Sequence, residues 1–325
     1  MSDLWNRPTG LCPLDELIAL DIKGEDAQTF LHAQLTNDVK SLAVGAAHYT
    51  AYCSPKGRML ANGYLGRLSE VHFRWVIHRS IAEKLVKRLS MFILRSKVKL
   101  ALLDTAQYYG MLPIEVHAYK DLLLSTETSV RPPELFSMRI TGNDDSSTFS
   151  LSYDRTLLVH TNNDTLDTSH LRSRIDWDIT SIAADEVLVE EATYEELIPQ
   201  MIEWDKIGGV SFKKGCYPGQ EIVARSHYLG KIKRRLFRAQ FEGTNVAIGC
   251  PITLVESPEQ NVGIVVRTAI TANGGILLAV LSTDKVNAQS LLCLNNEEKT
   301  PLRDLCLRFI SSKETPSATV TSSEV

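Results

Sequence analysis

Apolar residues recur at two different spacings along the first hundred residues, and these spacings predict a series of strands interrupted by two helices. Every second position from Val71 to Ile77 is apolar, which is typical of a strand, whereas Ala27, Phe30 and Leu31 recur at helical spacing. A Ser-Pro-Lys-Gly sequence at 54–57 predicts a tight turn between two strands. Adjacent antiparallel strands with helices indicate the α+β class. The expected strands span 17–22, 48–53, 58–68, 71–78 and 97–103, and the expected helices span 25–34 and 80–92.

The pattern of apolar and turn-forming residues changes after Arg235. Upstream, the pattern is less regular: strands are expected over 135–140 and 156–160, with a polar turn at 142–147, and a helix over 166–174. Downstream, short β-rich runs separated by turn residues indicate a small barrel or sandwich. The final segment is rich in Ser and Thr and is predicted to be disordered. The downstream runs are 236–241, 252–255, 262–268, 276–281 and 302–310, and the segment expected to be disordered is 311–325.

Composition narrows the class of protein. A chain of 325 residues that is 44% hydrophobic suits two or three globular domains. Its 35 basic and 39 acidic residues give a net charge of −4, so no overall positive field attracts nucleic acid. The sequence predicts neither a secretory signal nor a membrane span. None of its six cysteines stands at C-x-x-C spacing, so we expect no structural zinc site. The thiols are expected to be reduced and the protein to be cytoplasmic. The polar composition favours a monomer.

Charge is segregated in the third quarter of the chain. Residues 185–205 include eight acidic and no basic side chains, whereas 213–238 include eight basic side chains and only Glu221 as an acid. One interpretation is that the two stretches neutralise each other across a surface. The other is a basic rim beside a site for an anionic ligand.

The most informative segment is 208–221, which combines glycines, two lysines and one thiol. Pro218 suits the first position of a helix, and that placement would put Cys216 beside a helix N-terminus after Lys213 and Lys214. A helix N-terminus contributes about 0.3–1 kcal/mol, and one pKa unit corresponds to about 1.4 kcal/mol. The helix alone therefore leaves a thiol protonated at neutral pH, and the lysines would have to lower its pKa further. Cys216 is either a reactive thiol or a small residue packed in a turn.

Other residues also allow two interpretations. Lys214 would bind a carboxylate or phosphate beside the glycine turn, or lie in solvent. Glu221 and Arg225 would orient a ligand, or form an i,i+4 ion pair. Trp177 would be a platform for a flat heterocycle, or a core residue. The basic run 231–235 would bind phosphates, or be solvated. Motifs for dinucleotides, P-loops, nucleophile elbows and helical His pairs do not occur.

The segment Lys214–Glu221 reads Lys-Gly-Cys-Tyr-Pro-Gly-Gln-Glu and resembles the K-G-C-Y-x-G-Q-E motif of YgfZ-type folate-binding proteins. These proteins are related to the T-protein of the glycine cleavage system, an aminomethyltransferase. The resemblance covers most of residues 15–240. Supporting segments resemble the family in the same order, namely Phe30–Val39, Cys53–Arg58, Leu197–Gln200, Val223–Arg225 and Tyr228–Lys231.

The resemblance implies a bi-lobed folate-binding α+β region over 1–235, a C-terminal β-barrel over 236–311 and a tail over 312–325, with the lobes and barrel around a central hole. It implies tetrahydrofolate as the ligand and support of iron–sulfur proteins or their assembly factors, through which tRNA modification is affected indirectly. Cys216 is the expected reactive thiol. The expected folate-binding residues are Trp177, Lys214, Gly215, Tyr217, Gln220, Glu221 and Arg225.

Three positions depart from the family pattern. Leu17 replaces a second tryptophan of the folate site, and Glu203 replaces an asparagine. Ala61-Asn62 stands where the aminomethyltransferases have an acidic pair, so a carboxylate for general-acid chemistry has no counterpart there. A non-catalytic folate-binding role is therefore our first hypothesis. The alternatives are a folate-dependent one-carbon transferase and a scaffold that contacts tRNA or a cluster protein through 231–235.

Overall fold

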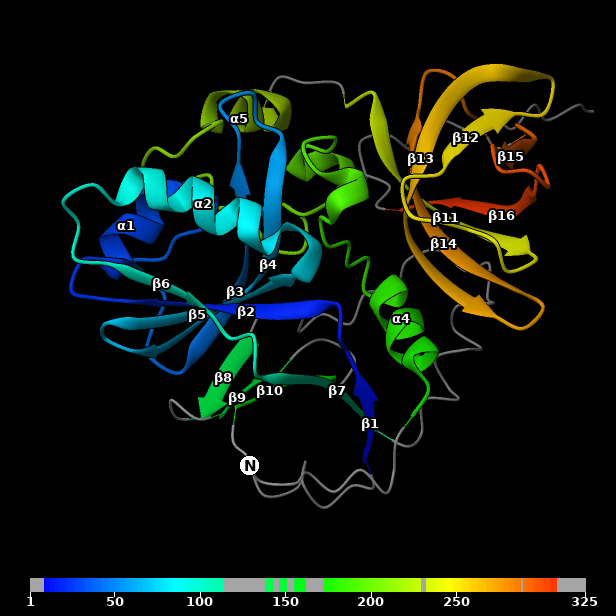
Figure 1. Ribbon diagram of the computed structural model, residues 1–325. Coiled ribbons are helices and arrows are strands. Elements are labelled where there is room, and N and C mark those ends of the chain that lie inside the picture. The colour runs from blue at the N-terminus through cyan, green and yellow to red at the C-terminus, as the bar shows by residue number, and fades with distance from the viewer. Residues whose placement is uncertain are drawn as a thin grey trace, which may run out of the picture.

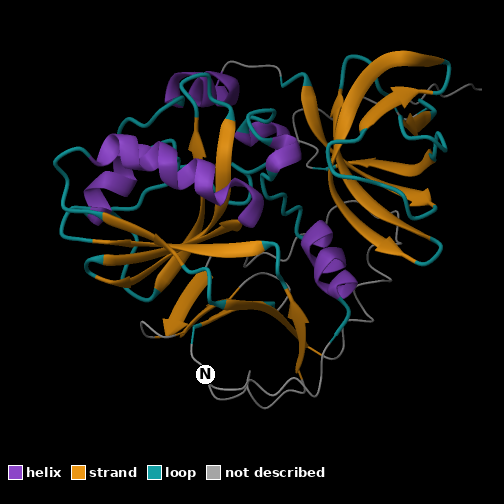
Figure 2. Cartoon of the chain, viewed as in Figure 1, coloured by secondary structure: helices purple, strands orange, loops and turns teal. Residues whose placement is uncertain are grey.

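The computed structural model describes residues 9–113, 138–142, 146–150, 155–161, 172–228, 232–287 and 289–308. Two β structures dominate it (Figures 1 and 2). One is a ten-stranded sheet of order β1-β7-β10-β9-β8-β3-β4-β5-β2-β6, and the other is a closed six-stranded barrel of order β11-β14-β13-β12-β15-β16. The predicted α+β fold with a C-terminal barrel is confirmed.

The first half of the large sheet follows the apolar pattern closely. Its strands and helices begin and end within a few residues of the predicted positions. The two helices lie together on one face of the sheet (Figure 1), and a short 3₁₀ turn precedes the second one. The elements are β2 (Leu17–Lys23), α1 (Ala27–Gln34), β3 (Ala46–Cys53), β4 (Met59–Ser69), β5 (His72–His78), α2 (Ala82–Ile93) and β6 (Lys99–Leu102).

Two polar positions of β5, His72 and Arg74, are as deeply buried as its apolar positions. Arg74 is fully buried and His72 is 4% exposed, because both face Asp21 on the neighbouring strand β2. Arg74 Nε donates to Asp21 Oδ1 at 2.7 Å, and His72 Nε2 lies 2.9 Å from Asp21 Oδ2. Paired and hydrogen-bonded charges can be buried without the large penalty of an isolated charge. The alternation in the sequence therefore marks a strand with two buried faces.

The second half of the sheet was predicted only in part. β1 and β7 were not predicted, because each short strand is defined by a partner about a hundred residues away, with Leu11 opposite Met111. β9 replaces part of the turn expected at 142–147, and residues 135–137 and 143–145 lie outside the described part of the chain. The strands are β1 (Thr9–Pro13), β7 (Gln107–Pro113), β8 (Met138–Gly142), β9 (Ser146–Ser150) and β10 (Thr156–His160).

Two helix predictions need correction. The helix expected at 166–174 is instead α4 (Arg174–Ala183), capped by the Ser173 side chain, while residues 162–171 lie outside the described residues. The helix expected to start at Pro218 is α5 (Gln220–Tyr228). Gly219 has a φ of +82°, which is not a helical value, so the helix begins at Gln220, two residues after Pro218.

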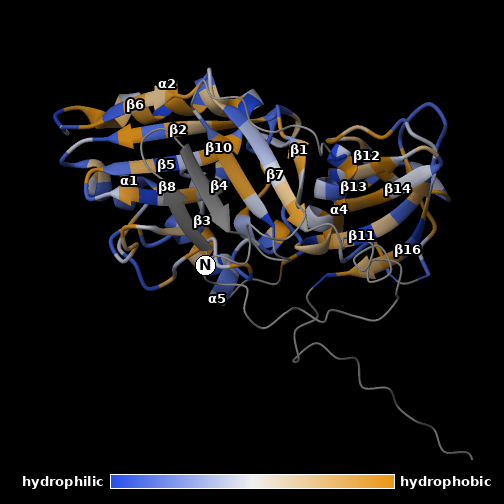
Figure 3. Ribbon diagram, turned by 90° about the horizontal axis from the view of Figure 1, so that it is seen from below, coloured by the Kyte–Doolittle hydropathy of each residue, from blue (hydrophilic) through white to orange (hydrophobic). Residues whose placement is uncertain are grey.

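The barrel has an apolar interior of its own, which includes Phe237, Ile252 and Leu277, and Figure 3 shows the largely hydrophobic β14. Its three-residue strand β15 was too short to be predicted from periodicity. The predicted tail and residues 309–310 lie outside the described residues. The barrel strands are β11 (Arg234–Glu242), β12 (Pro251–Leu254), β13 (Ser257–Thr271), β14 (Gly274–Ser282), β15 (Leu292–Leu294) and β16 (Pro301–Leu307).

Candidate functional site

The sequence segments that carry the resemblance meet in space. Thr36 Oγ1 donates to the carbonyl of Gly209 at 2.7 Å, and Asn37 Nδ2 donates to that of Gly208 at 2.8 Å. The backbone N–H of Met59 donates to the carbonyl of Leu197 at 2.7 Å. These bonds join the segment after α1 to the glycine turn, and the hairpin after Cys53 to the segment 197–200. Separate parts of the chain therefore build one support for the motif.

The start of α5 is pressed against the hairpin turn of residues 54–57. A side chain on Gly219 would begin 2.4 Å from the carbonyl oxygen of Ser54 and 2.8 Å from Gly57 Cα. Because its φ is also positive, only glycine fits here without strain. Gln200 Nε2 donates to the carbonyl of Val223 at 2.9 Å and fixes α5 from the other side. The turn that carries Cys216 is thus anchored at both ends.

Lys214 is buried and points at the C-terminal end of α1. Its Nζ donates to the carbonyl of Leu35 at 2.5 Å and also to that of His32. It lies 4.9 Å from the centre of the Tyr217 ring. A cation at these unpaired carbonyls stabilises a helix C-terminus. Lys214 is therefore not a solvated side chain, and its ammonium is already engaged by the protein.

Burial lowers the pKa of Lys214 to about 8, and the nearby Asp38 and Cys216 limit the decrease. We expect its acetylation by acetic anhydride to rise with pH and to reach half its maximum near pH 8, about two units below an ordinary lysine. Mass spectrometry at Lys214, with the adjacent exposed Lys213 as internal reference, measures this midpoint. The midpoint is independent of how fast the reagent reaches the buried amine, and a value close to the roughly 10.4 of an ordinary lysine would contradict the prediction.

Some of the other motif residues are buried or half-buried, and the rest are exposed to solvent. Tyr217 is buried and Gln220 is half-buried, whereas Gly215, Cys216, Glu221 and Arg225 are exposed. No ion pair joins Glu221 to Arg225 within the described ranges, so the expected i,i+4 pair is not formed. Sequence reasoning did not single out His32, whose Nε2 lies 4.0 Å from where a side chain on Gly215 would begin. Its Nδ1 is 3.2 Å from Asp38 Oδ1.

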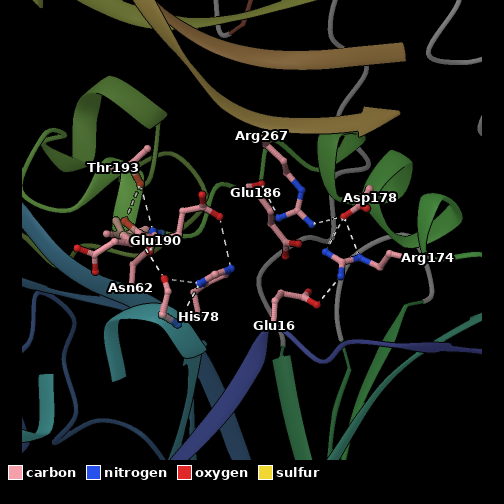
Figure 4. Close-up of polar contacts among 12 residues, drawn as sticks. Glu16, Asn62, His78, Arg174, Asp178, Glu186, Glu190, Thr193 and Arg267 are labelled. Carbon is pink, nitrogen blue, oxygen red and sulfur yellow. Dashed lines mark hydrogen bonds and ion pairs between the residues drawn. The ribbon is translucent and has the colours of Figure 1, made fainter. Parts of the chain in front are cut away.

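A second polar site lies where α4, the start of β2 and barrel strand β13 meet. It is a cavity of about 220 Å³. Figure 4 shows the polar side chains that converge on it from these elements, together with His78 at the end of β5 and Glu190. None of them was predicted as a site residue, because they lie far apart in the sequence and outside the motif. The charged and titratable lining residues are Glu16, His78, Arg174, Asp178, Glu190 and Arg267.

Ion pairs tie the cavity wall to the barrel. Asp178 Oδ1 accepts from Arg174 Nη2 at 3.0 Å and from Arg267 Nη2 at 3.1 Å, and Arg174 also pairs with Glu16. Burial raises the pKa of Glu16 and of Glu190. Burial, with the two arginines, lowers the pKa of His78 to about 4, so this imidazole is neutral at pH 7. The cavity thus offers carboxylates, guanidinium groups and a neutral imidazole close together.

Trp177 lies one residue before the cavity wall but is only 2% exposed. The Arg155 guanidinium lies 5.0 Å from the centre of its ring. Arg155 Nη1 is 2.8 Å from Glu186 Oε2, and Tyr49 donates its hydroxyl to Glu186. The Tyr49 ring is 5.0 Å from that of Trp204. In this structure Trp177 is a core residue, and a buried polar chain runs from it towards the motif.

Comparison with known proteins places these features in a family. The GCVT N-terminal domain family model matches residues 6–114. The tRNA-modifying protein YgfZ of Escherichia coli (strain K12 / DH10B) is 30% identical over 238 residues, which are 71% of each chain. The chain belongs to the YgfZ family. The YgfZ protein of Cronobacter sakazakii is 28% identical over 246 residues, covering 74% of this chain and 73% of that protein.

The fold extends to the aminomethyltransferases. The crystal structure of glycine cleavage system aminomethyltransferase T from Bartonella henselae matches with a TM-score of 0.68 at 14% identity, over 93% of this chain and 85% of that one. At this identity the match establishes the shared fold alone. The expected membership of the YgfZ-type proteins is confirmed by these relatives, and the expected T-protein-like fold is confirmed by this structure.

In this YgfZ-family chain, Asn62 has a structural role. It is fully buried, its Nδ2 donates to the carbonyl of Val187 at 2.7 Å, and its Oδ1 accepts from the N–H of Val189 at 2.6 Å. An aspartate could accept but could not donate, so it would leave the Val187 carbonyl unpaired and bury a charge. The amide clamps the extended segment that leads from Glu186 to Glu190.

The acidic stretch 185–205 is neutralised mainly by residues outside 213–238. Within the described residues, Asp185 pairs with Arg308, Glu186 with Arg155, and Glu191 with Lys84. From the basic stretch, Arg235 Nη2 lies 3.2 Å from Glu203 Oε1 and is largely buried. Arg235 is therefore not free to bind phosphates, which corrects that part of the 231–235 prediction. Residue 231 lies outside the described part.

Two further observations bear on cofactors and location. No group of three or more His, Cys, Asp or Glu side chains is placed to hold a metal ion within the described segments, and the six cysteines are free. No described helix is long and apolar enough to cross a membrane.

Proposed function

We propose that the protein binds tetrahydrofolate in the cavity between α4 and the barrel and supports iron–sulfur-dependent tRNA modification. The observation that carries the proposal is that two sequence positions associated with folate both lie beside this cavity. Leu17 and Trp177, the two positions that align with folate-site tryptophans, each stand next to a cavity residue, Glu16 and Asp178. The relatives named tRNA-modifying protein YgfZ support the cellular role.

The donor set of the cavity suits a reduced pterin. The pyrimidine edge of a pterin presents N–H donors beside a carbonyl, and buried carboxylates pair well with such an edge. Glu16 and Glu190 supply carboxyl groups, while Arg267 and Arg174 suit the carbonyl or the carboxylates of the glutamate tail. A volume of about 220 Å³ is below the roughly 300–1,000 Å³ of sites that enclose a drug-sized ligand. We therefore place the bicyclic ring inside and the tail at the mouth.

In this proposal the cavity binds folate, and the motif contacts a partner protein. Tetrahydrofolate is a one-carbon carrier, but Asn62 occupies the position of the acidic pair and is used structurally, so we do not assign aminomethyl transfer. The exposed Cys216 lies on a turn anchored at both ends. This placement suits contact with an iron–sulfur protein or an assembly factor, and the effect on tRNA would then be indirect.

Anaerobic calorimetric titration with tetrahydrofolate tests the site. Wild-type protein is expected to bind saturably, and Arg267→Ala to bind about tenfold or more weakly, because a hydrogen bond to a charged group is worth about 1.5–3 kcal/mol. Arg303→Ala is the matched control, since Arg303 forms a surface pair with Glu242 on the same barrel. Circular dichroism establishes that both variants fold. No saturable heat with the wild type, or equal affinity in the Arg267 variant, would overturn the proposal.

A further inference from the structure

A second cavity, at the end of the large sheet far from the barrel, is not used by the proposed function. It is an open groove of about 860 Å³ between α1 and the end of α2. Figure 1 shows these two helices side by side on the sheet. Its apolar wall comes from both helices, and the Oε1 atom of Gln34 in the wall is buried without a hydrogen-bond partner. Its lining includes Phe30, Ala33, Gln34, Phe92, Leu94 and Arg95.

The rim of this groove carries apolar side chains that the fold leaves in solvent. Met91 is 68% exposed, Phe92 43% and Leu94 87%. Leu94 also has a φ of +45°, an unfavourable conformation for a residue with a side chain, at the point where α2 ends. Exposed apolar side chains gathered around a groove are typical of a protein interaction site.

The α2 side of this surface is strongly basic, whereas Asp26, just before α1, is the one acid among the lining residues. Residues 82–99 include six basic side chains and one acid, Glu83. Lys84 and Lys97 are paired with Glu191 and Glu25. Lys87, Arg95 and Lys99 are exposed and form no ion pair within the described ranges. Lys87 and Met91 stand four residues apart on α2, so a cationic and an apolar group share one side of this helix. The charge complements an acidic partner.

We propose that this groove docks an acidic amphipathic helix of a partner protein. The apolar face of such a helix would cover Phe92 and Leu94, and its carboxylates would meet Arg95 and Lys87. Its side-chain donors would satisfy Gln34 Oε1. The position has a consequence for the motif, because α1 forms one wall of the groove and its C-terminal carbonyls hold Lys214. A partner docked here would lie one helix away from the turn that carries Cys216.

The probe is a fluorescein-labelled synthetic helix of about fifteen residues, with leucine along one face and glutamate along the other. The matched probe replaces every glutamate with lysine. Fluorescence anisotropy is expected to give micromolar affinity for the acidic helix at low salt and at least about tenfold weaker binding for the lysine helix. Phe92→Asp is expected to weaken the acidic helix about tenfold or more, whereas Leu291→Asp, at a 73% exposed leucine on the barrel, leaves it unchanged.

Arg95→Glu provides a second variant that changes an exposed residue and preserves the apolar rim. It is expected to reverse the preference between the two helices. The proposal is overturned if the acidic helix does not bind, or if Phe92→Asp and Leu291→Asp bind it equally. It is also overturned if unmodified tRNA transcript binds this surface in an Arg95-dependent manner and the acidic helix does not. Tetrahydrofolate binding is expected to be unchanged in every variant, so the two proposals can fail separately.

Discussion

Replacing Glu186 with alanine is expected to lower the free energy of unfolding by about 3–5 kcal/mol. Glu186 is 1% exposed and is surrounded by Arg155 at 2.8 Å, by the hydroxyl of Tyr49 and by that of Tyr64 at 3.2 Å. Burial alone would raise the pKa of Glu186, but Arg155 and these hydrogen bonds outweigh it and lower the pKa. Without the carboxylate, the guanidinium of buried Arg155 loses the ion pair with Glu186.

Urea unfolding followed by near-ultraviolet circular dichroism measures this loss. Glu186→Gln keeps the shape and one acceptor and is expected to destabilise less than alanine, while Glu191→Ala removes an exposed acid nearby and is expected to change stability by less than about 1 kcal/mol. The double variant Glu186→Leu with Arg155→Leu is expected to be more stable than Glu186→Ala, because the buried guanidinium is removed together with the buried carboxylate. Equal stability of Glu186→Ala and wild type would show that water reaches Arg155.

Local patterns were sufficient to predict the elements that are defined by their own sequence. Ala27, Phe30 and Leu31 predicted α1, and the Pro55-containing turn predicted the hairpin of β3 and β4. β1 and β7 could not be predicted in this way, because neither is a strand without its distant partner. The start of α5 was misplaced because the positive φ of Gly219 depends on its contact with Ser54, in a distant part of the chain.

The candidate sites, like the strands and helices, were predicted from the sequence only where their residues are contiguous. The motif was visible in the sequence because its glycines, lysines and thiol are contiguous, and the burial of Lys214 against α1 was not. Cavity residues such as Glu16, Asp178 and Arg267 come from three distant segments and have no local signature. A single clue to the cavity was available, namely the alignment of Leu17 and Trp177 with tryptophans of the family. The contiguous residues of the motif indicated its chemistry, and only the fold brought the charged cavity together.

Cys216→Ala is expected to abolish the cellular function and to leave the fold intact. The side chain is exposed and makes no hydrogen bond within the described residues, so its removal creates no cavity and leaves no polar group unsatisfied. Stability is expected to change by less than about 0.5 kcal/mol. If the thiol meets an iron–sulfur protein or assembly factor, modified nucleosides in a strain that lacks its own YgfZ protein should remain at the level of the empty vector.

The decisive comparison is among three variants, each checked for folding by circular dichroism. Cys250→Ala removes a partly exposed thiol from the barrel and is expected to rescue tRNA modification fully, as wild type does. Arg267→Ala is expected to fail through lost tetrahydrofolate affinity, whereas Cys216→Ala should fail with tetrahydrofolate affinity unchanged. Liquid chromatography with mass spectrometry of digested tRNA measures the rescue. Full rescue by Cys216→Ala would make this thiol dispensable, and the role of the motif would then reduce to holding α1 and α5 together through Lys214.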